Sequence, residues 1–315
     1  MGYNVKKGFA ADMELPAPAR IRELLQKHGI VLRKSLGQNF LMDGNIVRKM
    51  VAQSNLLPTD AVVEVGPGAG ILTAALAATC RHVVAVELDR RLLPLLEEVL
   101  GDRKNVTLVH GDALEVDFDA LVAEAAGPTP YKVVANLPYY ITTPLLMRLL
   151  AGGFQVTDMV VMVQKEVAAR LVAAPGSKEY GPLTVAVQYY SRPRVLFRVP
   201  RTVFFPPPEV DSCVVRLVRR REPPVDVGDE KLFFALVRGA FGRRRKTLAN
   251  ALAGAGIFPD WGRGEWEALL KECGLDPRRR GETLSLEEFA SLARACGGYL
   301  AKGGQGGRGE VSALH

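Results

Sequence analysis

The run Asn136-Leu137-Pro138-Tyr139 has the residue types with the most specific chemistry in this sequence. The side-chain oxygen of Asn136 and the carbonyl of Leu137 can each accept an N–H hydrogen bond, and Pro138 restricts the backbone that presents them. Tyr139 offers an aromatic face for stacking. Such a set suits an amine whose lone pair is delocalised, because two acceptors can pull its nitrogen toward tetrahedral geometry. The run alone fits adenine in RNA or DNA, a glutamine side chain, or a structural turn.

A glycine-rich loop precedes this run and predicts a cofactor site. The apolar residues 61–65 lead into Gly66-Pro67-Gly68-Ala69-Gly70 and then into a helical pattern. Glycine permits the sharp turn and a close approach of backbone to a ligand. The third glycine comes one residue earlier than in the loops that hold a dinucleotide pyrophosphate. We therefore interpret the loop as a site for S-adenosylmethionine, which has no phosphate, and keep a purely structural turn as the alternative.

Two acidic residues follow the next two apolar runs. Glu87 comes 21 residues after Gly66, where a carboxylate can accept hydrogen bonds from both ribose hydroxyls of a nucleoside. Asp112 ends the third run and could accept from the exocyclic amine of the cofactor's adenine. Asp89 fits a helix cap better than a ligand contact. Three such features at successive strand ends favour a cofactor site over three unrelated turns.

The periodicity predicts an α/β fold, a Rossmann-like S-adenosylmethionine-dependent methyltransferase domain with a smaller C-terminal helical domain. Helical spacing over residues 19–28 and 45–52 brackets a stretch, 32–43, that we predict to be a loop. Short apolar runs alternate with helix-length segments and indicate a mostly parallel sheet, and three later runs suit an antiparallel edge. The parallel runs cover residues 61–65, 82–88, 106–110, 132–135 and 159–163, and the edge runs cover 183–190, 195–199 and 213–218.

Four segments follow from these patterns and from the Gly, Pro and charge content. We predict a flexible N-terminal extension over residues 1–17 and the methyltransferase domain over 18–221. A helical domain then covers 226–298, and a Gly-rich disordered tail covers 303–315. We expect no internal repeats.

The composition narrows the class of protein and of partner. The chain has 315 residues, of which 48% are hydrophobic, with four scattered cysteines and four scattered histidines, so we expect neither a metal site nor disulfides. No apolar stretch is long enough for a membrane span or a signal peptide, and we expect a cytoplasmic protein. Residues 192–246 hold 14 Lys and Arg against 6 Asp and Glu, a local excess larger than the net charge of +7. That concentration indicates a polyanionic partner.

Together these motifs resemble the ribosomal RNA adenine N6,N6-dimethyltransferases, over about residues 21–295. The resemblance rests on seven segments in combination. They are Lys34–Leu41, the loop Gly66–Gly70, Glu87–Asp89, Gly111–Ala113, Asn136–Tyr139, Pro206–Ser212 and Arg243–Leu248.

The resemblance implies methyl transfer from S-adenosylmethionine to N6 of two adjacent adenines near the 3′ end of small-subunit ribosomal RNA. It implies that the RNA is held within an assembling 30S-type particle, and we expect a monomer without a membrane partner. It also implies roles that spacing alone does not show. These are cofactor contacts from Gln38, Asn39 and Leu41, an aromatic contact to the target base from Phe204 or Phe205, and phosphate contacts from Arg243, Arg244, Arg245 and Lys246.

Two alternatives stay open. Methyltransferases of the erythromycin-resistance type act on large-subunit RNA and share nearly every cofactor motif, although Pro206–Ser212 and Arg280–Ser285 favour the small-subunit family. A non-catalytic factor for ribosome assembly or transcription could keep the same fold, but the complete Asn136–Tyr139 run argues against it.

Overall fold

The computed structural model describes residues 15–33, 37–243 and 245–303, with the backbone alone for 301–303. Three predictions therefore lie outside the described residues, wholly or in part: the extension 1–17 up to residue 14, the tail beyond residue 303, and the phosphate contact of Arg244. The start of the Lys34–Leu41 motif, residues 34–36, also lies outside them. The described residues divide into two compact units, one within residues 15–168 and 191–219, the other within residues 169–190 and 220–303.

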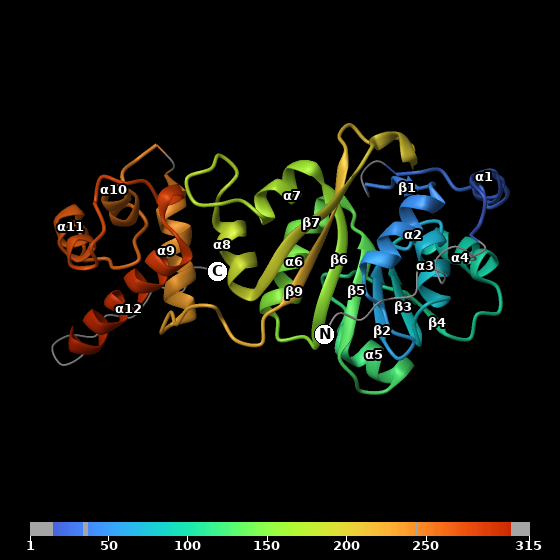
Figure 1. Cartoon of the computed structure of the whole chain (residues 1–315), viewed down its shortest axis with the longest axis horizontal. Coiled ribbons are helices and arrows are strands. Elements are labelled where there is room, and N and C mark those ends of the chain that lie inside the picture. The colour runs from blue at the N-terminus through green and yellow to red at the C-terminus, as the bar shows by residue number, and fades with distance from the viewer. Residues whose placement is uncertain (1–14, 34–36, 244, 304–315) are drawn as a thin grey trace. The chain divides into compact units, whose positions relative to one another are not determined.

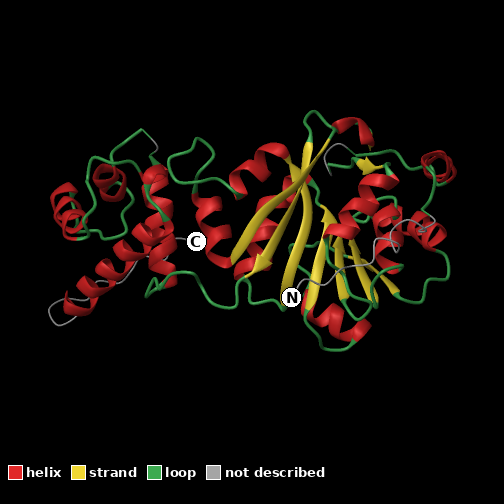
Figure 2. Ribbon diagram, in the orientation of Figure 1, coloured by secondary structure: helices red, strands yellow, loops and turns green. Residues whose placement is uncertain are grey.

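The first unit is built on a seven-stranded sheet (Figures 1 and 2). Its strands are β2 (Ala61–Val65), β3 (His82–Glu87), β4 (Val106–His110), β5 (Tyr131–Asn136), β6 (Val156–Gln164), β7 (Ser191–Val199) and β9 (Ser212–Arg219). Their order across the sheet is β4-β3-β2-β5-β6-β9-β7. The pairs from β4 to β6 are parallel, whereas β9 is antiparallel to both of its neighbours. The predicted parallel sheet with an antiparallel edge is confirmed.

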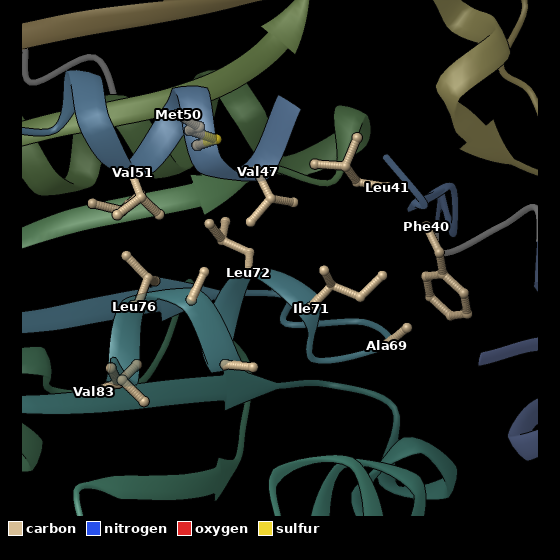
Figure 3. Packing of buried hydrophobic residues seen from close by; sticks show 14 of the residues in the cluster. Phe40, Leu41, Val47, Met50, Val51, Ala69, Ile71, Leu72, Leu76 and Val83 are labelled. Atoms are coloured by element: carbon tan, nitrogen blue, oxygen red, sulfur yellow. The ribbon is translucent and has the colours of Figure 1, made fainter. Parts of the chain in front are cut away.

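Helices cover the sheet of the first unit. They are α1 (Pro18–Lys27), α2 (Gly44–Gln53), α3 (Ile71–Ala77), α4 (Leu93–Leu100), α5 (Phe118–Ala126), α6 (Thr142–Ala151) and, continuing into the second unit, α7 (Lys165–Leu171). Helix α2 begins where the Asp43 carboxylate accepts the N–H of Asn45 at 2.8 Å, a standard N-cap. Figure 3 shows Val47 and Val51 of α2 facing Leu72 and Leu76 of α3, and Met50 belongs to the same buried cluster. Burial of each of these side chains contributes about 1.5–3 kcal/mol, so this contact anchors α2 to α3, the helix that follows the glycine loop.

A small second sheet lies in the segment predicted to be only a loop. Strand β1 (Phe40–Leu41) pairs antiparallel with β8 (Phe204–Phe205), which follows the short 3-10 helix η4 (Arg201–Val203). The partners are Phe40 with Phe205 and Leu41 with Phe204. Because they are more than 160 residues apart, no local pattern could have revealed this pairing.

The second unit is helical and has its own core. Its helices are α8 (Pro182–Tyr190), α9 (Glu230–Gly242), α10 (Leu248–Ala253), α11 (Arg263–Glu272) and α12 (Leu286–Gly303), with the 3-10 helix η5 (Gly281–Thr283). Both tryptophans of the sequence, Trp261 and Trp266, belong to this core. Among the residues that the structure describes, no helix is long and apolar enough to cross a membrane.

The predicted edge strand over residues 183–190 is wrong, because this segment forms helix α8. Its β-branched and aromatic residues are buried on nearly every side, which removes the helical alternation of polar and apolar positions. Pro182 at its start is the better signal, since proline suits the first turn of a helix. The helix belongs to the second unit, where Tyr189 lies beside Phe233 of α9 with ring centroids 5.3 Å apart. The unit boundary therefore departs from the predicted domain 18–221 at residues 169–190.

Candidate active site

One cavity of the first unit opens where β2, β3 and β5 end, and it encloses about 960 Å³ including its mouth. A site at the carboxyl ends of parallel strands is the expected place for a ligand in an open α/β sheet. All predicted cofactor residues and the whole predicted catalytic run line it. The lining residues are Gly37–Leu41, Glu64–Ala69, Ile71, Leu72, Val86–Leu88, Leu92, Gly111–Ala113 and Asn136–Ile141.

The glycine loop brings the cofactor wall and the catalytic run into contact. Gly66 and Gly68 have positive φ values of 67° and 57°, a region that favours glycine. A Cβ on Gly66 would lie 3.3 Å from the Pro138 ring, and one on Gly68 would lie 2.9 Å from the Phe40 ring. The loop is therefore pressed between the two segments that close the cavity, and any side chain at either glycine would push one of them away.

Glu87 is held in place by backbone N–H groups at the end of β3. Its Oε1 accepts the Asp89 N–H at 2.8 Å, and its Oε2 accepts the Gly68 N–H at 3.4 Å. Burial raises the pKa of Glu87 to about 6, although these hydrogen bonds oppose the shift. At neutral pH the carboxylate is therefore ionised, fixed and able to accept hydrogen bonds from a ligand.

Asp89 caps the 3-10 helix η2 (Arg90–Leu92), as predicted, but it also joins two walls of the cavity. Its carboxylate pairs with the guanidinium of Arg91 and accepts the Gln38 side-chain N–H at 2.8 Å. The hydrogen bond from Arg91 holds the pKa of Asp89 well below its usual range. Gln38 in turn accepts the backbone N–H of Arg33 at 2.7 Å. Asp89 thus fixes the segment that carries Asn39 and Leu41 to the end of β3.

The orientation of the Asn136 amide follows from its partner. Its Nδ2 donates to the backbone carbonyl of Asn39 at 3.3 Å. Since a carbonyl cannot donate, the amide nitrogen must face Asn39, and Oδ1 is left as an acceptor on the other side. The next residue is fixed through the Leu137 N–H, which donates to the Met162 carbonyl on β6 at 3.1 Å. The segment Gly37–Leu41 therefore lines the cofactor cavity and also orients the proposed acceptor through the Asn39 carbonyl.

Tyr139 is anchored by its hydroxyl to the antiparallel edge of the sheet. The hydroxyl lies 3.1 Å from Ser212 Oγ on β9, and burial raises its pKa. Tyr139 is the first residue of the 3-10 helix η3 (Tyr139–Ile141). The next residue of this helix, Tyr140, is 49% exposed. Tyr139 is thus a fixed ring beside the Asn136 acceptor, as stacking of a base requires.

Asp112 turns the chain after β4 as well as facing the cavity. Its Oδ1 accepts the Leu114 N–H at 2.8 Å, a turn of the Asx type. A Cβ on Gly111 would lie 2.7 Å from Val116, so the turn has no room for a larger residue. The local hydrogen bond orients the carboxylate, which lines the cavity together with Glu87.

Glu64 is a cavity residue that the sequence analysis missed. It is 1% exposed, and burial raises its pKa to about 8, with a smaller contribution from the nearby Glu87. The nearby Thr73 hydroxyl partly opposes this shift. A glutamate inside the apolar run Val62-Val63-Glu64-Val65 was the available signal, because a charge is costly at a buried strand position. At neutral pH this side chain is mostly a neutral acid beneath the glycine loop.

Neither predicted base-stacking phenylalanine lines the cavity. Phe204 is 4% exposed and belongs to the hydrophobic core, so it has no free face for a base. Phe205 is 37% exposed, with the Arg22 guanidinium 5.4 Å from its ring centroid. The structure therefore leaves Phe205 as the candidate, at the small sheet that borders the cavity through Phe40.

The predicted phosphate contacts lie in the second unit. Arg243, Arg245 and Lys246 are exposed and follow α9, while Arg244 lies outside the described residues. A second basic run meets the chain just after them, because the Leu248 N–H donates to the Arg279 carbonyl at 2.6 Å. That run, Arg278–Arg280, is more than 30 residues away in the sequence, so its place beside the first could not be predicted.

No group of three or more His, Cys, Asp or Glu side chains that could hold a metal ion occurs among the described residues. The four cysteines are free thiols. The polar side chains that line the cavity are carboxylates, amides and two phenols.

Comparison with known proteins agrees with this geometry. Residues 30–295 match the family model described as ribosomal RNA adenine dimethylase. The ribosomal RNA small subunit methyltransferase A of Pelotomaculum thermopropionicum is 57% identical over 92% of this chain and 98% of its own length. A dimethyladenosine transferase from Plasmodium falciparum has the same fold, with a TM-score of 0.69, 24% identity, and 84% of this chain and 98% of that one covered.

The 23S rRNA methyltransferase ErmE is also similar in structure, with a TM-score of 0.62, 26% identity, and 82% of this chain and 99% of that one covered. Its identity is less than half that of the small-subunit relative, so the large-subunit alternative is not favoured. The chain belongs to the ribosomal RNA adenine dimethylase family.

Proposed function

We propose that this chain transfers methyl groups from S-adenosylmethionine to N6 of two adjacent adenines near the 3′ end of small-subunit ribosomal RNA. The observation that carries the proposal is the Asn136 amide at the lining of the cavity, whose nitrogen is held by the Asn39 carbonyl so that its oxygen is left as an acceptor. The cofactor supplies an electrophilic methyl group when it is bound. The remaining work is binding and orientation, which the residues of the cavity can perform.

The donor set of the cavity fits this cofactor. Glu87 presents a fixed, ionised carboxylate to a ribose, and the side-chain oxygens of Asp112 can accept from an adenine amine. Gly66 and Gly68 allow the backbone to approach the ligand closely.

Asn136 and Leu137 would hold the target amine through its two N–H groups. Acceptors at these positions draw the nitrogen out of conjugation, and its lone pair then points at the incoming methyl. Methylation makes the amine strongly acidic, so its proton can pass to water without a dedicated general base. A second methyl transfer needs space beside the amine, and Tyr140, which is 49% exposed, leaves that side of the run open.

The RNA partner is supported by the basic runs of the second unit. Five basic residues of these runs are exposed, as contacts to phosphates require: Arg243, Arg245, Lys246, Arg278 and Arg280. We infer that the enzyme acts as a monomer in the cytoplasm on the RNA of an assembling small subunit. Neutralising Arg244 and Arg245 should weaken RNA binding and flatten its salt dependence, with an unchanged affinity for S-adenosylmethionine.

A methyl-transfer assay with labelled S-adenosylmethionine tests the function directly. Naked small-subunit RNA and immature small subunits serve as the two substrates, and nucleoside analysis identifies the product as N6-methyl- or N6,N6-dimethyladenosine. The modified positions are then mapped by primer extension. Label that appears only in large-subunit RNA, or in no adenine, would overturn the proposal.

The role of Asn136 has its own test. Asn136→Ala should reduce turnover by about 100-fold or more, because an oriented polar contact to the reacting group is lost, whereas calorimetry should show cofactor binding close to wild type. Asn45→Ala, at an exposed asparagine of α2, is the matched control. Near-normal turnover in Asn136→Ala would remove the acceptor role.

A further inference from the structure

The basic segment of the sequence is divided between the two units. Residues 191–219, which form β7, β8 and β9 of the first unit, hold six arginines and only two acidic residues, Glu209 and Asp211. This excess of positive charge belongs to the unit that contains the cavity, whereas the basic runs already assigned to RNA belong to the second unit. It is therefore a separate feature that needs its own explanation.

Two of these arginines share a face of the edge strand β7. Arg194 pairs with Arg216 of β9, and directly opposed residues of antiparallel strands point to the same side of a sheet. Arg192 lies two positions earlier and so points to that side as well. Strand β7 ends the sheet order, so one long side of it has no neighbouring strand in the seven-stranded sheet (Figure 2).

A bulge extends this face toward helix α2. The register shifts between Val195 and Phe197, which places Phe197 opposite Val214 and on the same side as the arginines. The Lys49 ammonium of α2 lies 4.2 Å from the centroid of the Phe197 ring. Lys49 therefore adds a third cation to the side of the sheet that Arg192 and Arg194 occupy.

The charges on this face are not balanced by carboxylates. Arg216 pairs with the buried Asp158, and Arg198, on the other side of the strand, pairs with Asp211. By contrast, Arg192, Arg194 and Lys49 are exposed, and none of the described carboxylates forms an ion pair with them. These three residues are named the β7 face below.

We propose that the β7 face, Arg192, Arg194 and Lys49, binds the sugar–phosphate backbone of the RNA that the cavity methylates. The proposal rests on the proposed function, since it takes RNA as the substrate. Guanidinium groups match phosphate oxygens in a bidentate geometry, and an aromatic ring beside an ammonium suits a nucleic acid surface. A second phosphate-binding surface on the catalytic unit would fix the RNA relative to the cavity independently of the second unit.

The chain connects the carboxyl end of β7 to the cavity. Strand β7 continues through η4 into β8, and β8 pairs with β1, whose residues Phe40 and Leu41 line the cavity. Arg192 and Arg194 lie near the amino end of β7, level with the start of β6. RNA backbone held by these arginines would therefore have to run along β7, past Phe197 and Lys49, to reach the rim where a base would enter.

Protection of an exposed sheet edge is the competing explanation. Charged residues and proline on an edge strand prevent pairing with other chains, and Pro193 already stands between the two arginines. That role does not involve Lys49, which lies on a helix. Lys49 therefore separates the two explanations.

The test compares the salt dependence of RNA binding. Wild type, Arg192→Gln/Arg194→Gln and Lys49→Gln are titrated with a transcript of the 3′ domain of small-subunit ribosomal RNA at several KCl concentrations. The slope of log affinity against log salt is negative, and each lost phosphate contact lowers its magnitude by about 0.7–0.9. The magnitude should fall by roughly 1.4–1.8 in the double variant and by about 0.7–0.9 in Lys49→Gln. Cofactor affinity should not change in either.

Arg81→Gln/Lys104→Gln is the matched control, because it removes two exposed positive charges just before β3 and β4, at the opposite edge of the same sheet. The proposal would be overturned if the salt slopes of the arginine variant and of Lys49→Gln equal the slope of this control. It would also be overturned if the arginine variant self-associates while Lys49→Gln binds RNA as wild type does. Methylation of the transcript and of immature small subunits by wild type is measured in parallel. If wild type methylates neither substrate, the proposed function fails; if it methylates either one and only the slopes disagree, the assignment of the β7 face alone is wrong.

Discussion

The buried acid Glu64 makes the stability of the first unit depend on pH in a defined direction. Its pKa is raised by burial from 4.5 to about 8. Between these values the unfolded chain has lost the proton while the folded chain keeps it, so the folded state binds one proton more. Stability therefore falls as pH rises, by about 1.4 kcal/mol per pH unit, and the stabilisation present below pH 4.5 is lost by about pH 8.

Replacement by glutamine isolates this effect, since Glu64→Gln keeps the shape of the neutral acid and cannot ionise. The variant should gain stability relative to wild type by about 3 kcal/mol between pH 5.5 and 7.5, from two pH units at about 1.4 kcal/mol each. Urea unfolding followed by circular dichroism measures the difference at each pH. Trp261 and Trp266 both lie in the second unit, so their fluorescence provides a separate record of that unit.

Glu87→Gln is the control for the pH window. The pKa of Glu87 is raised only to about 6, so its contribution should change between pH 4.5 and 6 and stay constant above that range. A difference between Glu64→Gln and wild type that does not vary from pH 5.5 to 7.5 would refute the reasoning, because it would mean that Glu64 has the same charge in the folded and the unfolded chain.

Three further outcomes concern the cavity. Affinity for S-adenosylmethionine should fall as pH drops through about 6, because protonated Glu87 accepts fewer hydrogen bonds; a constant Kd from pH 5 to 8 would contradict this. Gln38→Ala and Asp89→Ala should each weaken cofactor binding, and their effects should not add, since both remove the same 2.8 Å hydrogen bond between Gln38 and Asp89. Additive losses in the double variant would disprove the role of this hydrogen bond. Gly66→Ala should lower cofactor affinity and turnover together, because its Cβ would meet the proline of the catalytic run 3.3 Å away; a loss of affinity alone would show that the two are independent.

Local sequence was sufficient to predict the parallel part of the sheet and the cavity residues at its strand ends. The glycine loop, Glu87, Asp112 and Asn136 each end an apolar run, and parallel strands bring such ends to one edge. Their meeting in one cavity could therefore be predicted from their positions along the chain. The same reasoning failed for residues 183–190, because a helix buried on nearly all sides has no amphipathic period to detect.

The sequence by itself determined which residues have the chemistry to bind the cofactor and to accept the amine, because residue type and strand-end position are local properties. Only the tertiary structure decided how they are aimed. The Asn39 carbonyl turns the Asn136 amide, Asp89 holds Gln38, and the core takes Phe204 but leaves Phe205 exposed. The hydrogen bond between Gln38 and Asp89 and the pairing of Phe40 with Phe205 join residues 51 and 165 positions apart, and geometry between distant segments is fixed by packing, which no local pattern encodes.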